Sequence, residues 1–207
     1  MKSQQIILVD AGTGNLHSVQ NALLRLSVDV VVTDDPSLLR RSAGKVILPG
    51  VGAFARFMDG LQQRDLAGIL PEIVRRGDPL LGICVGMQAL FDLSEEMGET
   101  AGFSMLPGRV VRFLNMPGLK VPHTGWNQIW SRQPSALLEG LQPGAYAYFN
   151  HSYYCAASQE KDVLAVTSHG VDFPCIVRHD NAYGVQFHPE KSQSVGLKLL
   201  ENFVCIR

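Results

Sequence analysis

The first half of the chain alternates short apolar segments with helical ones, and this alternation constrains the fold more than any other feature. The segments IILVD (6–10), KVILPG (45–50) and PLLGI (79–83) are almost entirely apolar and are followed by turn residues or helical patterns. Strands that are apolar on both faces are typical of a parallel sheet that is covered on both sides. We therefore expect an α/β fold with a mainly parallel central sheet flanked by helices on both faces.

The second half is richer in short β-type segments separated by Gly, Pro and Asn. Segments such as RVVRFL, DVLAVTS and AYGVQF indicate antiparallel strands added beside the parallel core, and a last helix is predicted at about 194–204. A helix is also predicted from about Gly86. No repeat or linker interrupts the 207 residues. A chain of this length fits one domain, so we expect a single domain over 1–207.

Charge and hydropathy exclude several classes of function. The 18 Lys and Arg residues nearly balance the 19 Asp and Glu residues, and they form no basic run. A nucleic-acid binder usually carries a basic patch, so this class is disfavoured. The apolar runs are too short for a membrane span, and the start, MKSQQIILVD, lacks the pattern of a signal peptide. We expect a cytoplasmic protein.

The heptapeptide GICVGMQ (82–88) places Cys84 between two glycines at a predicted strand-to-helix junction. A sharp turn of this kind strains the apical residue and crowds the positions two residues away, which favours glycine there. A thiol at a helix start is favourably placed to act as a nucleophile, and the N–H of Val85 could help to bind an oxyanion. The alternative is a buried cysteine in a tight turn. The remaining cysteines show no metal-binding spacing and are predicted to be buried hydrophobes.

A cysteine nucleophile needs a base, and His188 in the segment HPE is the best of six histidines. His188 and Glu190 are two residues apart, so in extended structure they share a face, and Pro189 restricts the backbone between them. The segment predicts a base with its own orienting carboxylate. The alternative is a surface loop with an incidental ion pair.

The glycine-rich segment PGVGAF (49–54) follows a predicted strand of the same layer as Cys84. Its glycines allow a backbone N–H near Gly52 to turn toward a neighbouring site. The segment could supply a second oxyanion donor. A structural turn is an equally good interpretation of this segment alone.

Together these three segments resemble the class I, triad-type glutamine amidotransferases in their order along nearly the whole chain. The segments DAGTGNLHSV, KVPHTGWN, YFNHSYY and GVQFHPEKS narrow the resemblance to one branch of that family. Its members are glutaminase subunits that serve histidine biosynthesis. Ala11 departs from this branch, where Tyr is common, and Val85 stands where Leu is common.

The resemblance implies a mechanism and a substrate site. Cys84 would attack the carboxamide of glutamine, His188 would transfer protons, and Glu190 would orient His188. Gly52 and Val85 would bind the oxyanion. Glutamine itself would be held by Gln88 and by the backbone of His151, Ser152 and Tyr153. No metal and no organic cofactor is implied.

The resemblance also implies a partner, a separate cyclase subunit with a (β/α)8 barrel that receives the ammonia. We expect 207 residues to leave no room for this barrel. The expected contact surface and ammonia passage contain Thr13, Asn15, Trp126 and Lys191. The alternatives are a core position for Trp126 and a solvated charge for Lys191. We also expect weak glutaminase activity without the partner, because a mobile glycine loop would need it to present its N–H.

Three other functions stay open at the level of sequence. The chain could be the glutaminase subunit of another amidotransferase, or a cysteine hydrolase of γ-glutamyl peptides. It could also be a silent subunit that regulates a partner, although an intact set of nucleophile, base, orienting acid and oxyanion loop speaks against this.

Overall fold

The computed structural model describes residues 5–42 and 44–206. Residues 1–4, the first part of the segment MKSQQIILVD, therefore lie outside the described part. The helices are α1 (Leu16–Arg25), α2 (Pro36–Arg41), α3 (Phe54–Gln63), α4 (Ile69–Arg75), α5 (Val85–Gln88) and α6 (Gln193–Cys205). The strands are β1 (Gln5–Val9), β2 (Asp29–Thr33), β3 (Lys45–Gly50), β4 (Leu80–Cys84), β5 (Phe91–Ser94), β6 (Thr100–Ala101), β7 (Leu106–Arg112), β8 (His123–Ser131), β9 (Ala145–His151), β10 (Tyr153–Ala157), β11 (Val163–Ser168), β12 (Asp172–His179) and β13 (Ala182–Val185).

A large mixed sheet runs through the centre of the molecule. Its strand order over the described residues is β2-β1-β3-β4-β13-β12-β11-β8-β9. Pairing is parallel from β2 to β13 and antiparallel from β13 to β9. The predicted α/β class is confirmed, and the added antiparallel strands extend the same sheet. The segment AYGVQF differs from the prediction, because β13 pairs in parallel with β4 and so closes the parallel part.

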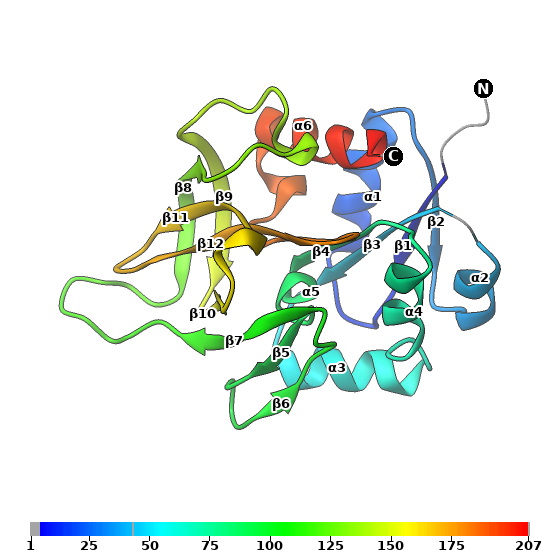
Figure 1. Cartoon of the computed structure of the whole chain (residues 1–207), viewed down its shortest axis with the longest axis horizontal. Coiled ribbons are helices and arrows are strands. Elements are labelled where there is room, and N and C mark those ends of the chain that lie inside the picture. The colour runs from blue at the N-terminus through cyan, green and yellow to red at the C-terminus, as the bar shows by residue number, and fades with distance from the viewer. Residues whose placement is uncertain (1–4, 43, 207) are drawn as a thin grey trace.

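The helices cover both faces of the parallel part. Figure 1 shows α1 and α6 on one face, and α3 and α4 with the adjacent α2 on the other. The start of α2 follows its sequence signal: the Asp35 side chain accepts a hydrogen bond of 2.8 Å from the Ser37 N–H, and Pro36 occupies the first turn. This layering leaves the carboxyl ends of β3, β4 and β13 together at one edge, where ligands bind in open α/β sheets.

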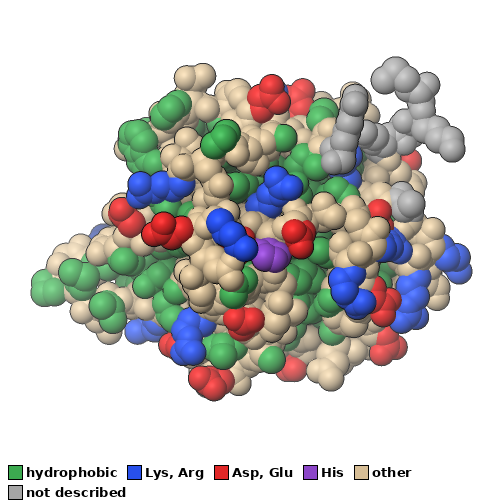
Figure 2. All heavy atoms as spheres, viewed as in Figure 1, with side chains coloured by type: hydrophobic (Ala, Val, Ile, Leu, Met, Phe, Trp, Pro, Cys, Tyr) green, Lys and Arg blue, Asp and Glu red, His purple; other side chains and the backbone are tan. Residues whose placement is uncertain are grey.

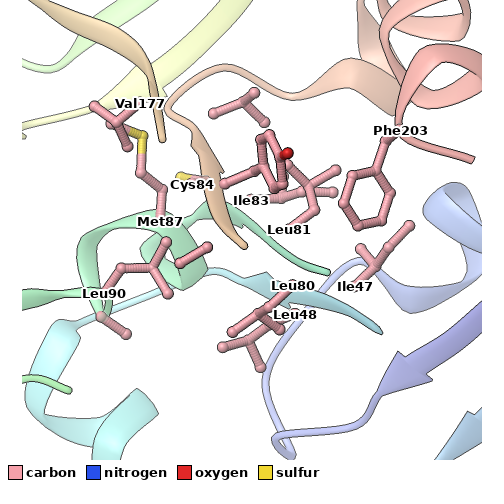
Figure 3. Packing of buried hydrophobic residues seen from close by; sticks show 14 of the residues in the cluster. Ile47, Leu48, Leu80, Leu81, Ile83, Cys84, Met87, Leu90, Val177 and Phe203 are labelled. Atoms are coloured by element: carbon pink, nitrogen blue, oxygen red, sulfur yellow. The ribbon is translucent and has the colours of Figure 1, made fainter. Parts of the chain in front are cut away.

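The core explains why the central strands are apolar on both faces. Every residue of β3 and β4 is buried, and their side chains alternate between the two helical layers. In Figure 3, Leu81 lies toward Ile47 and Phe203 of α6, whereas Leu80 lies beside Leu48 on the opposite side. Burial on both sides therefore fixes the position of β4, the strand that carries Cys84.

A second, smaller sheet was not expected from the sequence. Its order is β10-β7-β5-β6, and β5 was predicted to continue the helix that begins near Gly86. The helix instead ends at Gln88, because the next carbonyls accept hydrogen bonds from another segment: Phe103 N donates to Ala89 O at 2.8 Å and Met105 N to Leu90 O at 2.9 Å. Tertiary pairing overrides the helical pattern of this stretch.

The exposed surface agrees with the balanced composition. On the face in Figure 2, acidic and basic side chains are interspersed and do not separate into fields of one sign. None of the helices in the described part of the chain has the length and apolar character that crossing a membrane requires.

Candidate active site

The turn from β4 to α5 holds Cys84 in a strained conformation. Cys84 has φ 55° and ψ −109°, a region that side-chain-bearing residues rarely adopt. Such a conformation costs roughly 1–3 kcal/mol and persists where the surrounding structure enforces it. The predicted elbow is therefore present. Helix α5 after the elbow is only four residues long, so its macrodipole is small. The site therefore depends on the turn that positions Cys84 more than on the dipole of this helix.

The two glycines around Cys84 are required by close backbone contacts. A Cβ at Gly82 would collide with the carbonyl of Gly86, and a Cβ at Gly86 would collide with the carbonyl of Leu48 in β3. A Cβ at Gly50 would lie 2.7 Å from the Gly86 nitrogen. The elbow thus sits directly on the end of β3, which leads into the glycine-rich loop.

The His188–Glu190 pair adopts the geometry that its spacing predicts. His188 Nδ1 lies 2.9 Å from Glu190 Oε1, and the side chains are 5% and 1% exposed. The second oxygen, Glu190 Oε2, is buried without a hydrogen-bond partner among the described residues. This hydrogen bond is the only one that the buried Glu190 carboxylate makes among the described residues, and a charge-assisted hydrogen bond of this kind is strong. Glu190 therefore fixes the orientation of the imidazole.

The turn that carries His188 is held by β9 and α6. Ser192 Oγ donates to the His188 carbonyl at 2.7 Å and accepts from the Tyr148 N–H at 2.9 Å. The His188 N–H donates to the Tyr148 carbonyl at 2.9 Å. In α6, a Cβ at Gly196 would collide with the Pro189 carbonyl. Ser192 and Gly196 therefore support the base, a role that sequence reasoning did not assign to them.

The pKa of His188 reflects two opposing influences. Burial lowers it, but hydrogen bonds with Cys84 and Glu190, together with the charges of these groups, raise the pKa to about 10. An imidazole with this pKa carries a proton at neutral pH. The His188 imidazole next to Cys84 can therefore act as a proton donor at neutral pH.

A cavity of about 310 Å³ opens onto Cys84 and collects most of the predicted site residues. Those at its wall are Gly52, Cys84, Val85, Gln88, His151, Ser152, Tyr153, His188 and Lys191. Val51, Glu96, Pro122 and Asn150 also line it and were not predicted. The elbow with Gln88, the segment around His151 and the segment around His188 are far apart in sequence, so the fold builds one site from them.

The predicted oxyanion residues lie at the cavity wall. Gly52 has φ 92° and open space where a Cβ would be, which fits a loop that can change conformation. Glu96 anchors the next residues, because its carboxylate accepts the Phe54 N–H at 2.7 Å. Val85 is the first residue of α5, so its N–H has no partner within the helix.

The side chain of Gln88 is tied to the wall of the cavity. Its Nε2 donates to the Tyr153 carbonyl at 3.1 Å and to Gln186 Oε1 at 3.2 Å. Gln186 Nε2 in turn lies 3.8 Å from Cys84 Sγ. Gln186 is fully buried and was missed, although a glutamine two residues before His188 in an apolar strand is a detectable signal.

His123 and His151 lie in strands, although their segments KVPHTGWN and YFNHSYY have the polar and aromatic composition that is typical of loops. His123 begins β8, His151 ends β9, and the two are paired in register. The alternation of a strand places both rings on the same face, where they meet. Each sequence segment is rich in polar and aromatic residues, which hid its strand character.

Trp126 and Lys191, two of the predicted partner-facing residues, flank Tyr148. The Trp126 ring lies 6.0 Å from the Tyr148 ring, and Lys191 Nζ lies 5.7 Å above that ring. Trp126 is 46% exposed, which excludes a core position for it. The three side chains form a row beside the cavity.

Thr13 and Asn15 lie in the loop between β1 and α1, away from the cavity wall. Asn15 is the residue before α1, yet its side chain makes no capping hydrogen bond. Thr13 Oγ1 is buried without a hydrogen-bond partner among the described residues. Ala11 is fully buried, so its side chain cannot face a partner directly.

A larger cavity of about 870 Å³ lies elsewhere, beside β8 and β11, and it contains neither cysteine nor histidine in its lining. Although this cavity is larger, it is therefore not the better candidate for the active site. The smaller cavity is lined by the candidate nucleophile Cys84, the candidate base His188 and a polar wall, which makes it the better candidate site.

Comparison with known proteins defines the class. A family model described as glutamine amidotransferase class-I matches residues 7–206. The chain therefore belongs to the class-I glutamine amidotransferase family.

Individual relatives indicate to which branch of this family the chain belongs. The chain is 50% identical over 198 residues to "Imidazole glycerol phosphate synthase subunit HisH" of Moorella thermoacetica, covering 96% of this chain and 93% of the relative. A protein of the same name from Salinibacter ruber is 46% identical, with coverage of 96% and 93%. These identities place the chain in the HisH branch of the family, which is the branch that its short segments predicted.

Solved structures show the same fold at low identity. A structure described as a glutamine amidotransferase has a TM-score of 0.74 at 21% identity, covering 97% of this chain and 99% of the other. A structure of PurLQS from Thermotoga maritima has a TM-score of 0.73 at 15% identity, with 98% of both chains covered. These similarities concern the fold alone.

Proposed function

We propose that this chain is the glutaminase subunit of imidazole glycerol phosphate synthase, acting in histidine biosynthesis. The observation that carries the proposal is the position of Cys84 at a strained elbow, open to the same cavity as His188, whose imidazole is oriented by Glu190. The similarity to HisH subunits supports the same activity. We further propose that residues 1–207 act as one amidotransferase domain in the cytoplasm.

The proposed reaction uses Cys84 as nucleophile and His188 as acid and base. The proton of the Cys84 thiol resides on His188, the Cys84 thiolate attacks the carboxamide carbon of glutamine, and the N–H groups of Gly52 and Val85 bind the oxyanion that forms. His188 gives its proton to the leaving nitrogen, which departs as ammonia and leaves a thioester. His188 then takes a proton from water, the water oxygen attacks the thioester, and glutamate is released. Glu190 keeps the imidazole oriented through both steps.

One part of the cavity wall carries polar groups that could bind the polar end of glutamine. The backbone of His151, Ser152 and Tyr153 and the side chain of Gln88 line the same cavity as Cys84, and we propose that they bind the α-amino and carboxylate groups of glutamine. This arrangement would direct the carboxamide toward Cys84. The chemistry requires neither metal nor organic cofactor.

The ammonia is proposed to pass to a separate cyclase subunit with a (β/α)8 barrel. There it would be incorporated to give imidazole glycerol phosphate and an aminoimidazole carboxamide ribotide. The proposed contact surface contains Thr13, Asn15, Trp126 and Lys191. Its support is the row of Trp126, Tyr148 and Lys191 beside the cavity, because Trp126 is 46% exposed and aromatic residues are enriched at interfaces.

The proposal is tested by a glutaminase assay with the cyclase subunit and its nucleotide ligand present or absent. We expect slow hydrolysis by this chain alone and at least tenfold faster hydrolysis in the liganded complex, because the loop around Gly52 must present its N–H. Gamma-glutamyl peptides serve as the competing substrate. Preferential hydrolysis of these peptides, or full activity of the chain alone, would contradict the proposal.

A further inference from the structure

A buried pair of histidines beside the cavity has no part in the proposed chemistry. His123 Nδ1 lies 3.1 Å from His151 Nε2, and both residues are buried. His151 Nδ1 lies 2.7 Å from the Tyr153 carbonyl, and Asn127 Nδ2 lies 3.1 Å from His123 Nε2. The pair thus belongs to a continuous hydrogen-bonded chain that reaches the cavity wall at Tyr153.

The partners at the two ends fix the position of every proton in this chain. A carbonyl oxygen only accepts, so His151 Nδ1 must carry the proton that it donates to Tyr153. At the other end, the Asn127 amide donates to His123 Nε2, so His123 carries its proton on Nδ1 and donates it in a hydrogen bond to His151 Nε2. The Asn127 amide also donates to the Ser168 carbonyl at 2.8 Å. Each ring is therefore neutral and held in one tautomer.

The surroundings favour this neutral state. Burial, together with a smaller effect of the nearby His169, lowers the pKa of His123 to about 4. Burial also lowers the pKa of His151 to about 3, against the opposing effect of its hydrogen bond to Tyr153. His169 stacks on His123 at 4.2 Å, and the aromatic rings of Phe113 and Phe173 pack around the pair.

The Tyr153 carbonyl joins this chain to the nucleophile. It accepts one hydrogen bond from His151 at 2.7 Å and a second from Gln88 at 3.1 Å. Gln88 continues to Gln186 at 3.2 Å, and Gln186 lies 3.8 Å from Cys84 Sγ. A displacement of the Tyr153 carbonyl would therefore move both the wall of the cavity and the amide beside the sulfur.

We propose that His151 and His123 are positioning residues that hold the Tyr153 carbonyl, and with it the glutamine-binding wall, in place in the cavity that Cys84 also lines. This inference rests on the proposed function, because it assigns the wall to glutamine. Neither ring transfers a proton in the reaction. Their effect on turnover is exerted through Tyr153 and Gln88.

The alternative is that the pair merely fills the space between β8, β9 and β12. The two roles differ in what a substitution must preserve. A positioning role depends on the donor at His151 Nδ1, which the amide nitrogen of asparagine can replace. A packing role depends on volume and apolar contact, which leucine replaces better than asparagine.

The test compares His151→Asn with His151→Leu in the complex with the cyclase subunit and its nucleotide ligand, measuring KM for glutamine and kcat separately. We expect His151→Leu to raise KM by roughly tenfold or more, because a buried carbonyl loses its strongest partner. We expect His151→Asn to stay within about threefold of the wild-type KM, and kcat to change less than KM in both. His179→Asn, at a histidine paired with Asp162 outside the cavity lining, is the control and should leave KM unchanged.

Circular dichroism and co-elution with the cyclase establish that each variant is folded. If His151→Leu fails to fold, His123→Leu and His123→Asn provide the same comparison one residue further from the cavity. Equal KM values for the Leu and Asn variants, or a better result with Leu, would overturn the positioning role. Absence of glutamine-dependent turnover in the wild-type complex would instead overturn the proposed function.

Discussion

The strained backbone conformation of Cys84 depends on the close packing of the residues around it. Its positive φ is held by contacts of Gly82 and Gly86 with neighbouring backbone, so the strain cannot relax without moving β3. The spacing of glycines around this cysteine predicted the turn, and the two-residue spacing of His188 and Glu190 predicted their contact. Both features are local, which is why sequence was sufficient to find them.

Gln186, Ser192 and the His123–His151 pair were beyond such reasoning. Each has a partner that is far away in sequence: Gln186 and Cys84 are 102 positions apart, Ser192 and Tyr148 are 44 apart, and His123 and His151 are 28 apart. Long-range contacts of this kind depend on strand register, which no short segment encodes. The sequence shows that these residues are unusual for their surroundings, but it does not show which of them contact one another.

At the residue scale, Glu190→Gln tests the orienting carboxylate. The substitution keeps the shape of the side chain but removes the charge that favours the protonated imidazole of His188. We expect glutamine turnover by the complex to fall by about 10² to 10⁴-fold, less than after loss of the nucleophile. Steady-state kinetics of the folded variant measure this, and unchanged turnover would exclude an orienting role.

At the scale of elements, the strands of the parallel core were predictable because burial on both sides makes them continuously apolar. β3 and β4 follow this rule in full. The second sheet was not predictable, because β5 is half-buried and reads as the continuation of a helix. Its structure is decided by pairing with β6 and β7, which lie later in the chain.

Helix α6 has a function at this scale, since it braces the turn that carries His188. Gly196→Ala would place a methyl group against the Pro189 carbonyl and should destabilise the fold by about 1–3 kcal/mol. Glutamine turnover should fall as well, because the turn must move. Denaturant unfolding and kinetics of the same sample measure the two effects.

Gly68→Ala is the matched control for this change. Gly68 is exposed, has φ −79°, and has no atom within 4 Å of the position of a Cβ. Its substitution should change stability by less than about 1 kcal/mol. Equal destabilisation by the two substitutions would contradict the bracing role of α6.

At the scale of the whole molecule, buried histidines make stability depend on pH in two opposite ways. The pKa of His188 is raised to about 10, so its contribution is complete below about pH 6.5 and is lost as pH rises toward 10. The pKa of His123 is lowered to about 4, so its contribution is complete above about pH 6.5 and is lost as pH falls toward 4.

We therefore expect the unfolding free energy to be greatest near pH 6 to 7. Urea unfolding at a series of pH values measures it. In the alkaline range, the difference between wild type and His188→Asn should shrink as pH rises from 6.5 toward 9. A difference that is constant over this range would show that His188 does not bind its proton more tightly in the folded state.

The central claim is that Cys84 is the nucleophile of an ammonia-supplying subunit, and one pair of rates tests it most directly. Cys84→Ala is assembled with the cyclase subunit, and synthesis is measured with glutamine and with ammonium salt as the nitrogen source. We predict that glutamine-dependent synthesis is lost by at least about 10⁴-fold, whereas ammonia-dependent synthesis stays at the wild-type rate. Glutamine-dependent synthesis that survives the loss of the Cys84 sulfur would contradict the account.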